Sequence, residues 1–462
     1  MRIGGTECDW LVSRNLLMGY TIDDPFVKNS QKDCGMKNLQ YWFLVLIMVI
    51  LVIGCGSPPL ALPESTGQEE ANTPNSPLAT PKPEATATKV GYPIPEVISI
   101  PPQNVTTVDS LASGLKIVYA ETDGKAGESK IWMSNTDQLD KRVLLAKIGP
   151  HKPYYGLGGQ VSPDGTKLDY VVVPPDASSK SIVEIGYELW ILDIATQVSN
   201  KIPEAVNGFV KWTPDSKSIV YSRNKYDEMG GVDTKVYLMP LDDWQEKLVF
   251  STNSYFTPLE FLDNQRLLYL EIKSEKSAEV RSLDLTSGQT QLLREVDVPQ
   301  HWESYHLSPD KNTMLIVRVD TNSSEKKYEL IAVSLVTGEK QTLLTYPYHQ
   351  DVDRHPIYRP DVRWLPNSQD FVVHSPPQTD WVSHLDLMSV NTKVSPQPFL
   401  DNASFLKKPP EYSDLETFLM MGEWSPDGKW LTLLQYPKPG QLVYLLEVAT
   451  KKMTLIPLED PS

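Results

Sequence analysis

The 462-residue sequence predicts an all-β fold built from one repeated unit, and three observations lead to this prediction. A short turn motif containing Pro and Asp recurs at steps of 47 to 60 residues. Each copy is followed by a strand-like apolar run, such as LDYVVV or SIVYS. Tight-turn signals then separate this run from further short strand-like runs. Short strands at regular spacing with turns between them are typical of all-β repeat folds.

The turn motif has a physical explanation. Proline presets φ at the second position of a tight turn, Asp caps the turn through its side chain, and Gly or Ser tolerates the backbone that follows. An aromatic residue often precedes the motif, as at Trp212, Phe261, Trp364 and Trp424. The residues that we assign to structural repeat turns are Pro163, Asp164, Pro214, Asp215, Pro309, Asp310, Pro426 and Asp427.

Four strands in each unit of about 50 residues predict a β-propeller. Sandwich arrays lack such a period, and β-helix turns are shorter than about 30 residues. We expect seven blades, with six as the alternative. Seven strands follow a turn motif or its worn copy near Ser113, but only six complete strands precede one. We therefore expect residues 97–111 to supply the missing strand and to close the ring by pairing its two ends.

The motif Ser-Pro-Asp-Gly-Lys preceded by Trp, seen at residues 424–429, resembles the TolB-type, WD40-like Pro-Asp propeller repeat. The resemblance covers roughly residues 113–457 and implies the propeller fold. It also suggests a partner in cell-envelope assembly. Proteins of the TolB type carry an α/β domain before the propeller, whereas this chain has a Pro-rich segment in that place.

The N-terminal part predicts export and membrane anchoring. Residues 41–54 form an apolar run after Lys37, which is the layout of a secretory signal. With Cys55, Gly56 and Ser57, the run resembles the lipobox of bacterial lipoproteins, which implies lipidation of Cys55 and an extracytoplasmic, membrane-anchored location. A simple anchor helix is one alternative, although the run is short of the roughly 20 residues that a span needs. An ordinary cleaved signal is the other.

These observations divide the chain into four parts. Residues 1–35 show no signal character, and we expect them to be a non-native leader, with synthesis starting at Met36. Residues 36–54 are the expected signal peptide. Residues 55–102 combine the lipidated cysteine with a disordered Pro/Thr/Ser-rich tether, because large apolar residues are too scarce there to offset chain entropy. An O-glycosylated stalk would serve the same purpose. Residues 103–462 are the expected propeller.

Charge and motifs exclude several function classes. The net charge of −16 argues against a nucleic-acid partner, because phosphates attract Lys and Arg clusters. All three cysteines lie within the first 55 residues, so we expect no disulfide scaffold and no Cys–His catalysis in the propeller. We find no nucleophile elbow, no P-loop and no dinucleotide fingerprint. We also expect no α/β-hydrolase domain after Ser462, such as peptidases of the prolyl-oligopeptidase kind require. Accordingly, we assign no catalytic residues and no cofactor.

Long connections indicate where a ligand would bind. They fall at residues 174–187, 223–234, 346–361 and 401–421, and the alternation of strand direction puts all of them on one face. The richest carries our candidate binding residues, which are Tyr346, Tyr348, His349, Asp351, Asp353, Arg354, His355, Tyr358 and Arg359. A solvated loop packed on its own blade is the alternative interpretation. Oligogalacturonate lyases resemble this fold and use histidines with a metal, but we find no residue-by-residue match and assign no metal ligands.

Two function classes remain. We favour a non-catalytic lipoprotein whose propeller is a binding or scaffold module for protein, peptide or glycan. The alternative is a propeller enzyme that acts on polysaccharide, as a lyase or hydrolase, or on peptide. The expected partners are the membrane, through the lipid anchor, and an envelope protein or glycan. We expect a monomer.

Overall fold

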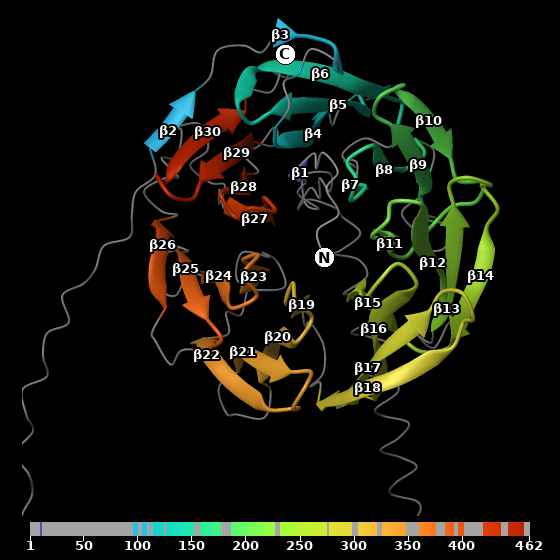
Figure 1. The fold of residues 1–462 in the computed structure, drawn as a ribbon, viewed down its shortest axis with the longest axis vertical. Helices are drawn as coiled ribbons and strands as arrows, with labels where there is room; N and C mark the ends of the chain where they lie inside the picture. The colour runs from blue at the N-terminus through green and yellow to red at the C-terminus, as the bar shows by residue number, and fades with distance from the viewer. Residues whose placement is uncertain are drawn as a thin grey trace, which may run out of the picture. The chain divides into compact units, whose positions relative to one another are not determined.

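The computed structural model describes residues 10–11, 96–99 and, with gaps between strands, 104–456. Within this part, seven separate sheets follow one another along the chain and surround a common centre, as Figure 1 shows. This confirms the predicted all-β propeller and its seven blades, and it excludes six. Cys55, the expected signal peptide and most of the expected leader and tether lie outside the described residues.

Each blade is named by its order in the chain. The first blade contains β4 (Lys116–Asp123), β5 (Glu128–Asn135) and β6 (Gln138–Ile148). The second contains β7 (Gly158–Val161), β8 (Lys167–Val172), β9 (Glu188–Asp193) and β10 (Val198–Lys201). The third contains β11 (Val210–Trp212), β12 (Ser218–Tyr226), β13 (Val232–Pro240) and β14 (Lys247–Thr252). The fourth and fifth contain β15 (Phe256–Phe261), β16 (Arg266–Ser274), β17 (Ser277–Asp284) and β18 (Thr290–Asp297); and β19 (Ser304–Leu307), β20 (Thr313–Asp320), β21 (Lys327–Ser334) and β22 (Lys340–Pro347). The last two contain β23 (Asp361–Trp364), β24 (Asp370–Ser375), β25 (His384–Ser389) and β26 (Gln397–Asp401); and β27 (Leu419–Trp424), β28 (Trp430–Gln435), β29 (Leu442–Glu447) and β30 (Lys452–Ile456).

The sequence repeat and the blade are offset by one strand. The strand before each turn motif pairs antiparallel with the strand after it, as β11 does with β12, and forms the inner edge of the same sheet. Three further strands then lead outward, and the chain crosses to the inner edge of the next blade. The four strands expected for each unit are present, but the strand that carries the aromatic residue begins the following blade.

The ring closes differently from our expectation. Residues 96–99 and 104–105 do pair with both ends of the propeller, but they do so at outer edges. Strand β2 (Glu96–Ser99) runs parallel to β30, and β3 (Asn104–Val105) runs parallel to β6. They therefore do not supply the missing inner strand of the first blade, whose inner edge pairs instead with β1 (Trp10–Leu11), parallel to β4. Unpaired outer edges at both ends of the ring explain why the segment lies there.

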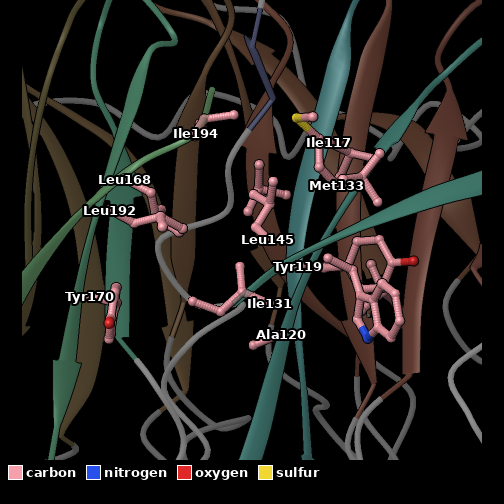
Figure 2. Packing of buried hydrophobic residues seen from close by; sticks show 14 of the residues in the cluster. Ile117, Tyr119, Ala120, Ile131, Met133, Leu145, Leu168, Tyr170, Leu192 and Ile194 are labelled. Atoms are coloured by element: carbon pink, nitrogen blue, oxygen red, sulfur yellow. The ribbon is translucent and has the colours of Figure 1, made fainter. Parts of the chain in front are cut away.

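Apolar side chains fill the spaces between consecutive blades. One cluster joins the seventh, first and second blades, so the two ends of the ring share a core. Figure 2 shows its central part, where Leu168 and Tyr170 of the second blade face Ile131 and Leu145 of the first. Five further clusters join the remaining neighbouring pairs of blades. This packing makes the inner strands a rigid frame.

The turn motif links blades as well as strands. In the second blade the Ser162 hydroxyl donates to Asp164 at 2.7 Å. The backbone N–H of Asp164 donates to the Ser216 hydroxyl in the turn of the next blade at 2.9 Å. The same contact joins Asp310 to Ser368. Burial raises the pKa of the Asp164 carboxyl, but hydrogen bonds from Ser162 and from Thr166 outweigh burial and hold that pKa below its usual value.

One of the expected long loops is mostly strand. Residues 223–234 were expected to form an irregular connection. Instead β12 and β13 continue their pairing as far as Tyr226 and Val232, which leaves only residues 227–231 between them. The polar sequence of this stretch is explained by the exposure of a hairpin that extends beyond the packed core.

Candidate functional site

Six inner strands surround the centre of the propeller, namely β7, β11, β15, β19, β23 and β27 (Figure 1). The residue before the last one of each strand is polar. These residues, which we call the polar ring, are Gln160, Lys211, Glu260, His306, Arg363 and Glu423. All except Lys211 are partly exposed. The ring therefore brings charges of both signs and neutral polar groups to the inner edges of six consecutive blades.

Members of the polar ring reach towards the next inner strand. The Lys211 ammonium lies 3.5 Å from the Glu260 carboxylate, and their side chains are 7% and 45% exposed. Arg363 donates to the carbonyl oxygens of Met421 and Gly422 on β27 at 3.3 and 3.1 Å. It also forms an ion pair with Asp361 at 2.7 Å. These contacts fix the direction of each charged side chain.

The aromatic residues before the turns connect each inner strand to the previous one. Trp212 Nε1 donates to the carbonyl oxygen of Gln160 at 3.1 Å and to the carboxylate of Asp169 at 2.6 Å. Trp364 Nε1 donates to the carbonyl oxygen of His306 at 2.9 Å. In both cases the indole reaches back to the previous inner strand, so ring residues and aromatic residues together connect neighbouring blades.

His306 is a titratable member of the ring whose pKa is strongly lowered. Burial among the inner strands lowers its pKa to about 4; the cationic Arg363 acts in the same direction and the anionic Asp361 opposes it. Its Nε2 atom lies 3.0 Å from the Ser304 hydroxyl. His306 is therefore neutral near pH 7 and offers hydrogen bonding without charge.

A second pair of chemically suggestive residues lies in the first blade. The Ser129 hydroxyl and His151 Nε2 are 2.8 Å apart, which is the distance expected for a nucleophile and its base. Their side chains are only 1% and 2% exposed. A nucleophile must reach its substrate, so this pair is better explained as a clamp that fastens the segment after β6 to the start of β5.

The structure describes one of our nine candidate binding residues. Tyr346 lies near the end of β22, is 6% exposed and packs in the core between the fifth and sixth blades. It is therefore a core residue of these two blades. The other eight residues lie outside the described residues, and they are Tyr348, His349, Asp351, Asp353, Arg354, His355, Tyr358 and Arg359.

The sequence analysis did not identify the polar ring, although a signal exists. The residue three positions before each turn proline is polar in every complete copy of the motif, as at Lys211 before Pro214 and Arg363 before Pro366. A polar residue in that place interrupts a short apolar strand. It is recognisable as a ring only when the inner strands are known to converge.

Two further observations concern metal and membrane. Among the residues that the structure describes, no group of three or more His, Cys, Asp or Glu side chains is placed to hold a metal ion. Within the same part of the chain, no helix is long and apolar enough to cross a membrane.

Comparisons with known proteins point to one family. The family described as the prolyl oligopeptidase N-terminal β-propeller domain matches residues 123–354. No curated protein matches the chain in sequence.

Solved structures of similar proteins are distant in sequence. A structure from a study of two prolyl endopeptidases is 16% identical with a TM-score of 0.49, covering 74% of this chain and 48% of that one. Oligogalacturonate lyase from Vibrio parahaemolyticus is 13% identical with a TM-score of 0.42, over 64% and 75% of the two chains. TolB from Acinetobacter baumannii is 11% identical with a TM-score of 0.39, over 79% and 94%. The chain thus spans about half the length of the prolyl endopeptidase that it matches.

Proposed function

The chain belongs to the prolyl oligopeptidase N-terminal β-propeller domain family, and from this premise we propose that it is a non-catalytic module that binds a peptide or protein segment at its polar ring. The propeller is held at the extracytoplasmic face of a bacterial membrane by a lipid on Cys55. Fold alone does not determine activity, so the proposal depends on the site.

The polar ring is the observation that supports this function. Its side chains come from rigid inner strands, and Lys211, Glu260 and Arg363 are held by contacts to a neighbouring strand, so little conformational entropy is lost when a ligand binds. Both signs of charge, the Gln160 amide and the His306 imidazole lie within one ring. Such a set suits the alternating donors and acceptors of a peptide backbone and its charged side chains.

Binding assays on the purified full chain test this function. We expect synthetic peptide arrays to yield ligands, and we expect Glu260→Gln combined with Glu423→Gln to weaken their binding at least tenfold. Glu295→Gln is the matched control, because Glu295 is exposed on the outer strand β18. Unchanged affinity in the double variant would place the ligand elsewhere.

The same preparation separates binding from catalysis. Peptides and oligogalacturonates incubated with the chain should be recovered intact by mass spectrometry, and metal analysis should find no stoichiometric ion. Cleaved products or a bound metal would overturn the non-catalytic proposal. Oligosaccharide binding that the double variant abolishes would keep the binding function and change the ligand class to glycan.

The anchor is tested independently of the ligand. Labelled fatty acid should be incorporated into the wild-type protein and not into Cys55→Ala, which should also leave the membrane fraction. Peptides from residues 1–35, which include β1, should be missing from the purified protein if synthesis starts at Met36, and the inner edge of the first blade then lacks that strand. Recovery of those peptides would contradict the proposed start. The acidic propeller, part of a chain with net charge −16, should stand away from anionic lipid on its tether.

A further inference from the structure

A groove of about 590 Å³ lies between the first and second blades. Its first-blade wall is residues 144–150, at the end of β6 and just beyond. The second blade contributes chiefly Tyr170, Glu188, Trp190, Gln197 and Ser199. Blades diverge towards the outside of a propeller, and here the outer strands leave a space that the shared core does not fill.

The wall formed by β6 includes an open strand edge. On its inner side β6 pairs with β5 along its length. On its outer side β3 pairs only with Lys141 and Arg142, and no described strand pairs with β6 beyond that point. The carbonyl oxygen of Leu144 accepts a hydrogen bond from Gln197 at 2.7 Å. Alternate residues after it turn their N–H and C=O groups towards this edge, as in any edge strand.

The protein itself shows that outer edges of this ring accept extended segments. Strand β3 adds in parallel to β6, and β2 adds in parallel to β30 in the seventh blade. A ligand strand beside residues 144–148 would continue the line that β3 begins. The open edge is thus the continuation of a pairing that the chain already uses.

The second-blade side of the groove supplies a floor for side chains. Tyr170 and Trp190 are cross-strand neighbours whose ring planes differ by 6° and whose centroids are 6.3 Å apart. Trp190 is partly exposed and donates to the Glu188 carboxylate at 3.2 Å, whereas Tyr170 is 4% exposed and supports the Trp190 ring from the core. A flat aromatic floor beside a strand edge suits an apolar or proline side chain of a paired strand.

The charged groups at the groove are already paired. Lys147 lies 3.6 Å from Glu128, and Glu188 forms an ion pair with Lys201. A ligand therefore needs no particular charge. Main-chain hydrogen bonds and an apolar contact fit an extended peptide better than a glycan, whose hydroxyl groups would have to compete for these paired side chains.

We propose that this groove binds an extended peptide segment of a partner protein, which adds as a strand to the free edge of β6 and lays an apolar side chain on Trp190. This site lies at the outer edge of the ring and is separate from the polar ring. It does not depend on the function proposed above, and the variants that test the two sites are different.

The test begins with random heptapeptides displayed on phage and selected against the full chain, with the best binder remade as a synthetic peptide. Ser199→Trp, which fills the groove, should weaken this peptide at least tenfold. Lys340→Trp at the corresponding position of the fifth blade is the matched control and should change affinity less than twofold. The double variant Glu260→Gln and Glu423→Gln should also bind normally.

Two measurements on the unaltered protein guard against misfolding of the variant. N-methylation of alternate peptide bonds in the ligand should weaken binding at least tenfold, because it removes the main-chain donors. Bound peptide should slow hydrogen exchange of the amides in residues 144–148.

Several results would overturn the proposal. They are a selection in which Ser199→Trp weakens none of the recovered peptides, exchange protection confined to other strands, or an oligosaccharide as the only ligand that Ser199→Trp blocks. Slow exchange of residues 144–148 without any peptide would also overturn it, because the chain itself would then occupy the edge.

Discussion

His306 shows how the surroundings of one residue create a response to pH. Burial lowers its pKa to about 4, below the value of about 6.5 for an unperturbed histidine. Between these values the unfolded chain binds a proton that the folded protein does not, so stability falls as pH falls. The contribution of neutral His306 is complete above about pH 6.5 and is lost on acidification to about pH 4. We expect a loss on the order of 2 kcal/mol in the free energy of unfolding, measured by urea denaturation at pH 7 and pH 4.5.

The variant His306→Gln isolates this effect because glutamine does not titrate. Aspartates of the turns, such as Asp164 and Asp310, have lowered pKa values and also lose stability in acid. They are present in both proteins, so only the difference between the two pH profiles reports on His306. Parallel profiles between pH 7 and pH 4.5 would show that the burial of His306 has no energetic consequence.

Residue patterns in the sequence predict the turns better than the site. Pro and Asp act locally, so their spacing alone predicts where strands start. The polar ring depends on six strands that are far apart in sequence, and no local rule distinguishes Glu260 from a solvated carboxylate. Tyr346, which we singled out as an aromatic residue beside a polar loop, is buried between the fifth and sixth blades, and local sequence does not show such burial.

At the scale of elements, the turns stabilise the contact between blades. Ser216 accepts the hydrogen bond from the Asp164 N–H in the previous turn while its own φ is +60°. We expect Ser216→Ala to lower the free energy of unfolding by about 1 kcal/mol, because the hydrogen bond is lost and the left-handed backbone remains. Ser216→Gly loses the same bond but adopts that backbone without strain, so it should cost less.

Thermal unfolding of the two variants under the same conditions measures this difference. Thr196→Ala is a suitable comparison, because Thr196 is exposed in a turn within the second blade and bonds only to Asp193 among the contacts described here. If Ser216→Gly proves less stable than Ser216→Ala, backbone strain at the positive φ of residue 216 does not determine the stability of these variants.

Strand number and order followed from the repeat, but blade membership did not. The sequence unit ends with the strand before the turn, and nothing local shows that β11 pairs with the strand after it rather than with β10. The tight turn decides the question, because two strands joined by five residues, 213–217, pair as a hairpin. Loop lengths were misjudged for a similar reason, since the polar residues of the β12–β13 hairpin look like a loop.

At the scale of the whole molecule, residues 96–105 hold the two ends of the ring together. They pair in parallel with β30 of the last blade and with β6 of the first, which are far apart in sequence. Our expectation identified the segment that joins the ends and was wrong about the edge. Period and composition show that a segment is needed, while the choice of edge depends on which hydrogen-bonding groups are left open after the blades form.

A disulfide placed across β2 and β30 tests this closure. Ile98 and Thr454 are register partners, and the chain has no cysteine after Cys55, so Ile98→Cys with Thr454→Cys can be examined in a background where the three native cysteines are serine. Neighbouring strands lie about 4.8 Å apart, near the separation that a disulfide needs. We expect oxidation to form the bond and to change migration on a non-reducing gel. The bond closes a very long loop, so the oxidised form should be more stable by about 2–4 kcal/mol.

Ile98→Cys with Lys452→Cys is two residues out of register and should oxidise much more slowly. Equal oxidation of both pairs would mean that β2 slides along β30, and the ring would then be closed by the shared core of the seventh, first and second blades alone.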